Sequence, residues 1–209
     1  MPYRPHPSET VAHPHARAAF AARLRPLLPA DGLLTTVEAL RPYECDGLTM
    51  ARQVPWLVAL PETVEQVQAV LRECHAAGVP VVARGAGTGL SGGALPLENG
   101  LLLSLSRFNR ILALDPLNRS ARVQPGVRNL AISEAAAPHG LYYAPDPSSQ
   151  IACTLGGNVA ENAGGLHCLK YGLTVHNVIE VTLLTMDGER LTLGGSGLDG
   201  PGYDLLAVV

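Results

Sequence analysis

Residues 84–93 read Arg84-Gly85-Ala86-Gly87-Thr88-Gly89-Leu90-Ser91-Gly92-Gly93 and directly follow the short apolar run 79–83. We interpret this run as a buried strand that opens into a glycine loop. Glycine has no Cβ and adopts positive φ at little cost, so such a loop exposes successive backbone N–H groups. Consecutive N–H groups form a concavity that binds anions. The stretch therefore predicts a loop for the pyrophosphate of a dinucleotide, and an ordinary glycine-rich turn is the alternative.

Two better-known phosphate loops fit this stretch poorly. The residues from Gly87 to Gly92 match G-x-G-x-x-G, and Asp115 lies about twenty residues further on, as in nicotinamide-binding Rossmann domains. That pattern counts only where the glycines open a helix, whereas here Pro96 and a Glu-Asn-Gly turn lead to an apolar run. A strand at 101–106 would exclude the Rossmann alternative. The loop also lacks the Gly-Lys-Ser/Thr of a Walker motif, since Lys170 is the only lysine of the chain.

The composition is that of a globular protein. The chain has 209 residues, of which 47% are hydrophobic and 16% charged, enough for one core or two small subdomains. The formal net charge of −3 and the lack of a basic run give no support to a nucleic-acid partner. No apolar stretch is long enough to span a bilayer, and the N-terminus does not read as a signal peptide. We expect a cytoplasmic protein without a transmembrane segment.

The cysteines and histidines do not predict a metal site. Four cysteines are scattered without a C-x-x-C pair, so we expect reduced thiols and neither zinc nor an iron–sulfur cluster: Cys45, Cys74, Cys153 and Cys168. The pair His13 and His15 flanks a proline in a polar leader, and we assign no metal there.

The domain organisation that we expect is a leader with one short helix, followed by a domain in two subdomains. The leader spans 1–34, with the helix at about 14–28. The domain spans 35–209 and divides into 55–108 and 109–209. We predict that the first subdomain is a β-α-β unit, with a capping box opening its helix, and that its elements are strand 56–60, helix 63–78, strand 80–83, the glycine loop and strand 101–106.

The second subdomain is predicted to be mainly antiparallel. Its expected elements are a hairpin at 110–124, a helix at 127–139, an extended piece at 141–143, a short helix around 156–162 and a hairpin at 177–193. The chain ends on the apolar run 205–209, which reads as a strand with no terminating signal. That ending suggests a fragment of a longer protein.

A second glycine-rich region completes the pattern. In order, it consists of Pro145-Asp146-Pro147-Ser148-Ser149, Thr154-Leu155-Gly156-Gly157-Asn158, Asn162-Ala163-Gly164-Gly165 and Cys168-Leu169-Lys170-Tyr171-Gly172. Together with the first loop, these segments resemble the FAD-binding domain of the vanillyl-alcohol oxidase/p-cresol methylhydroxylase flavoprotein superfamily. Within it, the chain is most similar to the D-subunits of bacterial glycolate oxidases and to FAD-linked D-lactate and D-2-hydroxyglutarate dehydrogenases. The likeness covers roughly residues 35–209.

The resemblance implies a two-subdomain α+β domain of the p-cresol methylhydroxylase type, with FAD between the subdomains, that ends before the C-terminal cap domain. It implies that the first loop wraps the pyrophosphate with backbone amides, and that later segments line the ribityl chain, the isoalloxazine ring and the adenine end. The implied cofactor-binding residues are Arg84, Gly85, Ala86, Gly87, Thr88, Gly89, Leu90, Ser91, Gly92, Pro145, Asp146, Ser148, Ser149, Leu155, Gly156, Gly157, Asn158, Asn162, Gly164, Gly165, Tyr171, Gly172 and Ile179.

Several of these residues have a plain alternative. Arg84 could contact a phosphate or pair within the protein, and Asp146 could lie near the ring or simply form a turn. His167 could approach the flavin edge or face solvent. Some relatives tether flavin through a histidine in the first loop or through a cysteine near Cys153. The loop here has no histidine, and a packed thiol fits Cys153 better, so we expect non-covalent FAD.

The resemblance implies oxidation of a D-2-hydroxy acid, such as glycolate or D-lactate, to the 2-oxo acid. A base removes the hydroxyl proton while the α-hydride passes to flavin N5, and an iron–sulfur subunit is the expected electron acceptor. The base is expected in the cap domain, so no catalytic residue is assigned and this chain alone is expected to be inactive, with weak FAD retention. Two alternatives remain open: another substrate, as in alkyl-glycerone-phosphate synthase-like or aromatic-alcohol enzymes, and a cofactor-free binding or assembly module.

Overall fold

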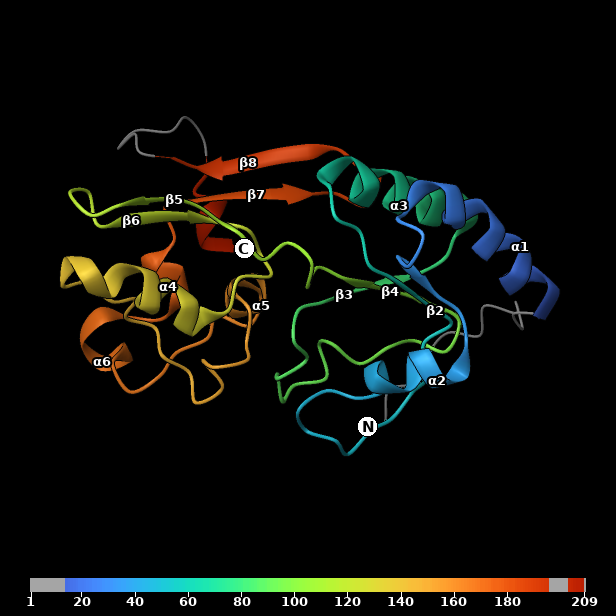
Figure 1. Cartoon of the computed structure of the whole chain (residues 1–209), viewed down its shortest axis with the longest axis horizontal. Coiled ribbons are helices and arrows are strands. Elements are labelled where there is room, and N and C mark those ends of the chain that lie inside the picture. The colour runs from blue at the N-terminus through green and yellow to red at the C-terminus, as the bar shows by residue number, and fades with distance from the viewer. Residues whose placement is uncertain (1–13, 196–202, 209) are drawn as a thin grey trace.

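The computed structural model of the protein describes residues 14–195 and 203–208 (Figure 1). Its first half is built on a four-stranded sheet with the order β1-β2-β4-β3. Strands β2, β3 and β4 are parallel, and β1 is antiparallel to β2. The strands are β1 (Leu33–Leu34), β2 (Leu57–Ala59), β3 (Val81–Arg84) and β4 (Leu101–Ser104). The expected β-α-β unit is confirmed.

Helix α3 (Val64–Ala77) connects β2 to β3 and begins at the predicted capping box. The Thr63 side chain accepts a hydrogen bond from the Gln66 amide at 3.3 Å, and the Gln66 side chain accepts one from the Thr63 amide at 3.3 Å. The helix ends at Gly78, which has a φ of 65°. Val67, Val70, Leu71 and Cys74 lie at helical spacing and are buried.

Both faces of the sheet are covered, because alternate strand residues point to opposite sides. Leu57, Ala59, Leu101 and Leu103 pack on one side, in a core shared with α3 and with α1 (Pro14–Leu24), which leads into the 3₁₀ turn η1 (Arg25–Leu27). Val58, Leu60 and Leu102 pack on the other side with Leu40 of α2 (Val37–Leu40), which leads into the 3₁₀ turn η2 (Arg41–Tyr43). Strands β2 and β4 are buried on both faces, which explains their continuous apolar runs. The prediction that the strand before the glycine loop is buried was wrong: β3 lies at the edge of the sheet, and Ala83 is exposed.

The glycine loop forms the entire connection between the parallel neighbours β3 and β4. No helix lies between Arg84 and Leu101, a segment that the structure describes throughout, and β4 begins where the Rossmann alternative required a helix to continue. The nicotinamide reading of the G-x-G-x-x-G match is therefore excluded. The loop leaves the sheet at the carboxyl end of β3, a common position for ligand sites in parallel sheets.

The second half contains two antiparallel hairpins and several short helical segments, and both predicted hairpins are confirmed. Its elements are β5 (Ile111–Asp115), β6 (Ser120–Val123), α4 (Asn129–Ala136), η3 (Ala137–His139), α5 (Leu155–Ala160), α6 (Cys168–Tyr171), η4 (Thr174–Asn177), β7 (Glu180–Leu184), β8 (Arg190–Gly194) and η5 (Leu206–Val208). Among the described residues, the hairpins β5-β6 and β7-β8 are separate two-stranded ribbons that do not join into one larger sheet.

Residues 141–143, predicted to be an extended piece, belong to neither a helix nor a strand. One local prediction for the second half was wrong. The run 205–209 was expected to be a strand, yet Leu206–Val208 form a 3₁₀ turn; Val209 lies outside the described residues. His13 also lies outside them, and the rest of the chain contains no cluster of three potential metal ligands within the ranges that the structure describes.

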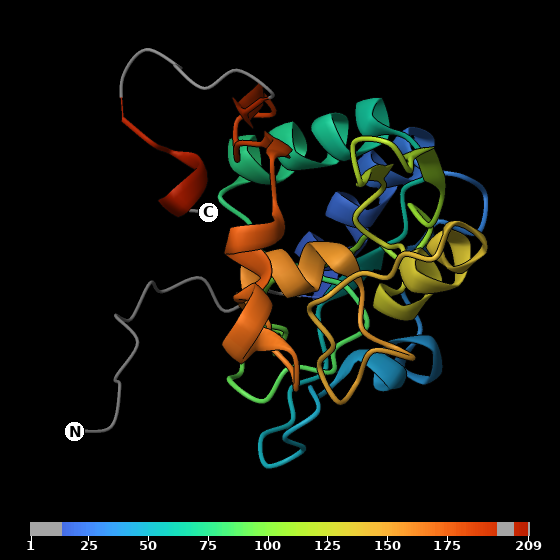
Figure 2. The ribbon, with the colours of Figure 1, turned by 90° about the vertical axis from the view of Figure 1, so that its left-hand side faces the viewer.

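The two halves lie side by side, and the β7-β8 hairpin reaches across to α3 (Figures 1 and 2). The turn carbonyl of Gly188 accepts hydrogen bonds from Gln68 Nε2 at 2.8 Å and from Arg72 Nη2 at 3.2 Å. Leu184 of β7 packs against the core of the first half. Within the described ranges, none of the helices has the length and apolar character needed to cross a membrane.

Candidate dinucleotide site

The glycine loop presents a row of unpartnered backbone donors. In the described part of the chain, the amides of residues 85–91 donate to no protein acceptor, whereas the Gly92 amide donates to Asp46 Oδ2 at 2.9 Å. Gly87 and Gly92 have φ values of 70° and 81°, which only glycine adopts without strain. These residues are half-exposed or exposed, so their free N–H groups are accessible to an anionic ligand.

Arg84 lies beneath this loop and is held by the protein itself. Its side chain is buried, and Nη1 donates to Cys45 O at 2.8 Å and to Ala94 O at 3.2 Å. The guanidinium carbon lies 5.7 Å from the centre of the Tyr43 ring. Burial lowers the pKa of Arg84, an effect opposed by the neighbouring Cys45, Tyr43 and other acidic groups. A Cβ on Gly87 would overlap Arg84 Nη2, so the guanidinium lies directly under the loop.

The structure brings the first loop against the second glycine-rich region. A Cβ on Gly85 would overlap Thr154 Oγ1, and a Cβ on Gly93 would lie 2.7 Å from Glu161 Oε1. The Thr154 hydroxyl is buried and has no hydrogen-bond partner among the described residues. An orphaned hydroxyl beside a row of free amides is an observation that fits a polar ligand at this junction.

A buried amide network holds the second region in place. Asn129 Nδ2 donates to Pro145 O at 2.8 Å and to Asn158 Oδ1 at 2.9 Å. Asn158 Nδ2 in turn donates to Cys153 Sγ at 3.3 Å. Cys153 is therefore a packed thiol, as expected, and Asn158 points into the protein. In the same region, the Gly156 amide donates a hydrogen bond to the Pro125 carbonyl at 2.8 Å.

We expect Asn129→Ala to lower the free energy of unfolding by about 1–3 kcal/mol, because two buried acceptors lose their donor. Urea unfolding of the protein without added cofactor measures this change. Asn109→Ala is the matched control, since Asn109 is exposed and should change stability by less than about 0.5 kcal/mol. Equal effects of the two substitutions would contradict the role given to the buried amide.

A second group of predicted residues gathers around Asp146. Asp146 Oδ2 lies 2.7 Å from His167 Nδ1, and Asp146 Oδ1 accepts the His167 amide at 3.1 Å. Burial raises the pKa of Asp146, but the bonds and charge of His167 outweigh it and hold the pKa below its usual 3.8. Tyr142 lies 5.7 Å from the His167 ring and 6.2 Å from the Tyr171 ring, measured between centroids. These rings are exposed, and Lys170 Nζ lies 4.9 Å from the centre of the Tyr171 ring.

The depressed pKa of Asp146 predicts a pH-dependent contribution to stability. A carboxyl whose folded pKa is below its unfolded pKa stabilises the protein above the unfolded value, and this is lost as the pH falls through the folded value. Asp146→Asn should therefore destabilise the protein at pH 6 but not at a pH well below 3.8. Urea unfolding at both pH values tests this, with exposed Glu98→Gln as the control. A difference that persists unchanged in acid would contradict the assignment.

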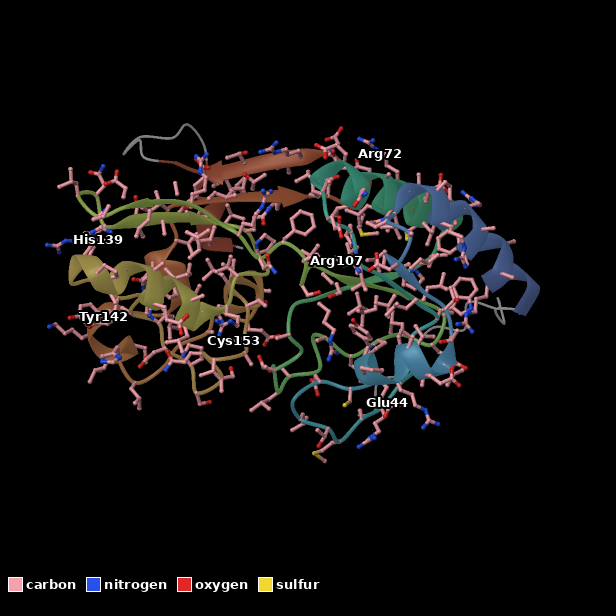
Figure 3. All side chains as sticks on the ribbon, viewed as in Figure 1. Glu44, Arg72, Arg107, His139, Tyr142 and Cys153 are labelled. Carbon is pink, nitrogen blue, oxygen red and sulfur yellow. The ribbon has the colours of Figure 1, made fainter. Side chains whose placement is uncertain are left out.

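The remaining predicted residues follow these two groups. Gly165 packs so closely on the Asp146 backbone that a Cβ would overlap it, and the Asn162 side chain accepts the Val175 amide at 3.1 Å. Ile179 is exposed. Figure 3 places Cys153 on the side of the second half that faces the first half, whereas Tyr142 lies at its far end. Within the second half, the predicted residues thus form an extended band rather than one compact cluster, whereas residues 84–92 lie in the first half.

One pocket of about 130 Å³ touches this band at a single predicted residue, Asn162, and is below the size of cofactor pockets, about 300–1,000 Å³. It is lined by Val159, Asn162, Val175, Val178, Val181, Leu206 and Ala207. Outside this pocket, the free amides of the first loop and the orphaned Thr154 hydroxyl lie where the two glycine-rich regions meet.

Sequence reasoning missed three residues that shape this surface: Asp46, Asn129 and the Thr154 hydroxyl. Asp46 and Asn129 bond segments that lie 46 and up to 29 residues away along the chain. No local pattern marks such contacts. Thr154 belongs to the second glycine-rich region, and its place two residues before a pair of glycines is the one available signal.

Comparison with known proteins supplies the family. The family described as FAD binding domain matches residues 55–194. The glycolate oxidase subunit GlcD of Escherichia coli is 64% identical over 192 residues, which is 92% of this chain and 38% of that protein. The D-2-hydroxyglutarate dehydrogenase of Xanthomonas citri pv. viticola is 38% identical over 182 residues, covering 87% of this chain and 39% of that relative.

Solved structures agree on the fold. An alkyldihydroxyacetonephosphate synthase matches with a TM-score of 0.75 at 22% identity, over 91% of this chain and 40% of that one. This chain thus spans about two fifths of the length of the relatives that it matches. The family match, the relatives and the structural likeness confirm the resemblance carried by the two glycine-rich regions: the chain belongs to the FAD binding domain family.

Proposed function

We propose that this chain is the FAD-carrying part of a protein that oxidises a D-2-hydroxy acid, of the glycolate or D-lactate class, to the 2-oxo acid. The observation that carries the proposal is 64% identity, over 92% of the chain, with a glycolate oxidase subunit. A relative named D-2-hydroxyglutarate dehydrogenase supports the same substrate class at 38% identity. The likeness to the alkyldihydroxyacetonephosphate synthase, at 22% identity, concerns the fold alone and does not favour that activity.

In this proposal the first loop binds the pyrophosphate through its free amides, residues 85–91. Thr154 Oγ1 adds a donor at the junction, and Arg84 contributes positive charge from beneath the loop. The second group, around Asp146, borders the flavin ring. When bound, FAD supplies the acceptor for the hydride of the substrate. We retain the division at about residue 108 as the boundary between the two subdomains that flank the cofactor.

We further propose that FAD is held without a covalent bond. The Cys153 thiol is buried and accepts a hydrogen bond from Asn158, so it is poorly placed to attack a flavin. No residue of the chain is assigned as the catalytic base. An electron-acceptor subunit of the iron–sulfur type is the proposed partner, since the Escherichia coli relative is named as a subunit of its oxidase.

Flavin titration tests the cofactor assignment. The protein should quench FAD fluorescence on binding and should bind FAD more tightly than riboflavin, which lacks the pyrophosphate. Acid should release the flavin into solution, whereas colour that stays on the denatured chain would contradict non-covalent binding. A protein that binds neither compound in its full-length form would overturn the proposal in favour of a cofactor-free module. Reduction of bound FAD by glycolate or D-lactate in the full-length protein, measured as the loss of the visible absorption of oxidised flavin, tests the substrate class.

A further inference from the structure

We name the segment from Tyr43 to Gly47 the strap. It precedes residues 55–194, which match the family, and it is hydrogen-bonded to the glycine loop. The Gly47 amide donates to Gly89 O at 2.9 Å. The Cys45 carbonyl accepts from Arg84 Nη1 at 2.8 Å. A segment that precedes the family match therefore bonds both the entrance and the middle of the loop.

Asp46 makes the central contact of the strap. Its side chain is buried, with a relative exposure of 6%. Oδ1 accepts the Leu48 amide at 3.0 Å and so fixes the turn of the strap itself, while Oδ2 accepts the Gly92 amide at 2.9 Å. Bonds from amides to a carboxylate are stronger than bonds between neutral groups. One carboxylate thus joins two turns that lie 46 residues apart in the chain.

Next to Asp46, the strap and the glycine loop pack in direct contact. A Cβ on Gly47 would lie 2.6 Å from Thr88 O, so the strap and loop backbones are in direct contact. Of the loop amides, Gly92 is bonded to the strap carboxylate, whereas those of residues 85–91 stay free. A glycine-rich loop loses much conformational entropy when it is ordered. A loop that is already held at Gly89 and Gly92 has less conformational entropy to lose when a ligand binds.

We propose that Asp46 is a positioning residue for FAD: it fixes the far end of the glycine loop so that the free amides are preorganised for the pyrophosphate. The inference rests on the proposed function of the loop. In this arrangement Asp46 acts through the loop, because it is buried and its two oxygens bond the amides of Leu48 and Gly92. Its negative charge interacts favourably with the buried Arg84 guanidinium.

The test compares Asp46→Ala and Asp46→Asn with the control Glu44→Gln in the full-length protein. Glu44 lies on the same segment but bonds the exposed Arg52 at 2.9 Å instead of the loop (Figure 3). Asp46→Ala should raise the dissociation constant for FAD at least about tenfold. Asp46→Asn should fall between wild type and Asp46→Ala, because its oxygen replaces only one of the two carboxylate oxygens and its NH2 group cannot accept from the other N–H. Riboflavin, which lacks the pyrophosphate, should lose less affinity than FAD does.

Hydrogen exchange in the wild-type protein without FAD provides a test that needs no variant. The Gly92 amide should exchange more slowly than the free amides of Leu90 and Ser91. Equal exchange of the three amides, or Asp46→Ala binding FAD as tightly as Glu44→Gln, overturns the inference. Equal loss of FAD and riboflavin affinity in Asp46→Ala also overturns it, since that pattern indicates general unfolding. Wild type that binds no FAD would instead refute the proposed function, so the two failures are distinct.

Discussion

Gly87→Ala is expected to destabilise the protein far more than Gly140→Ala, although the two glycines have nearly the same backbone conformation. Their φ values are 70° and 68°. Placing a side chain in this left-handed region costs about 1–2 kcal/mol, and this cost is common to both. A Cβ on Gly140 meets no atom within 4 Å, whereas a Cβ on Gly87 would overlap the Arg84 guanidinium. Displacing that buried cation from its carbonyl partners should add about 1.5–3 kcal/mol.

Urea unfolding without FAD measures the two substitutions, and the difference between them isolates the contact with Arg84. FAD titration of the same proteins adds a second comparison. Gly87→Ala should weaken FAD binding strongly, because the loop must leave its shape, while Gly140→Ala should leave binding unchanged. If both variants lose the same stability and bind FAD alike, the guanidinium does not lie under the loop as described.

Arg84→Met should lower the free energy of unfolding by about 3 kcal/mol, because two carbonyls each lose a hydrogen bond to a charged group, a contribution of about 1.5–3 kcal/mol. Methionine fills part of the volume, but the carbonyls of Cys45 and Ala94 lose their donor and the Tyr43 ring loses its cation. Thermal and urea unfolding both report the loss.

The control for Arg84 is Arg52→Met, on the neighbouring segment. Arg52 is exposed and pairs with Glu44 at 2.9 Å, a kind of ion pair that contributes about 0–1 kcal/mol. Arg84→Lys separates charge from shape, since lysine keeps the charge but lacks the planar fork that serves two carbonyls. It should recover only part of the lost stability. Full recovery by lysine would show that charge alone matters at this position.

The elements that are most predictable from sequence are those with local signals. The capping box at Thr63 and Gln66, the apolar spacing of α3 and Gly78 at its end define that helix without any long-range contact. The Rossmann alternative can also be excluded from the local sequence, because the residues between the glycines and β4 are too few for a helix. The run 205–209 misleads, since an apolar composition does not reveal whether a neighbouring strand is available.

The direction of side chains is much harder to predict than their location. Sequence places Arg84 at the start of the first glycine-rich stretch and Asn158 in the second glycine-rich region, but it cannot say that both point inward to protein partners. Asp46 lies in an irregular segment without periodicity, so no sequence signal distinguishes it. Its importance comes from one hydrogen bond across 46 residues, and only tertiary structure supplies such a contact.

The docking of the β7-β8 turn on α3 has a consequence for the order of folding. Gln68 and Gly188 are 120 residues apart, and Leu184 completes a core whose other members come mostly from the first 108 residues. Contacts of such long range form late and slow the folding of a chain. During synthesis, the N-terminal half can therefore bury most of its core between the sheet and its own helices before the β7-β8 hairpin emerges, and only the contacts of Leu184 and Gly188 form afterwards.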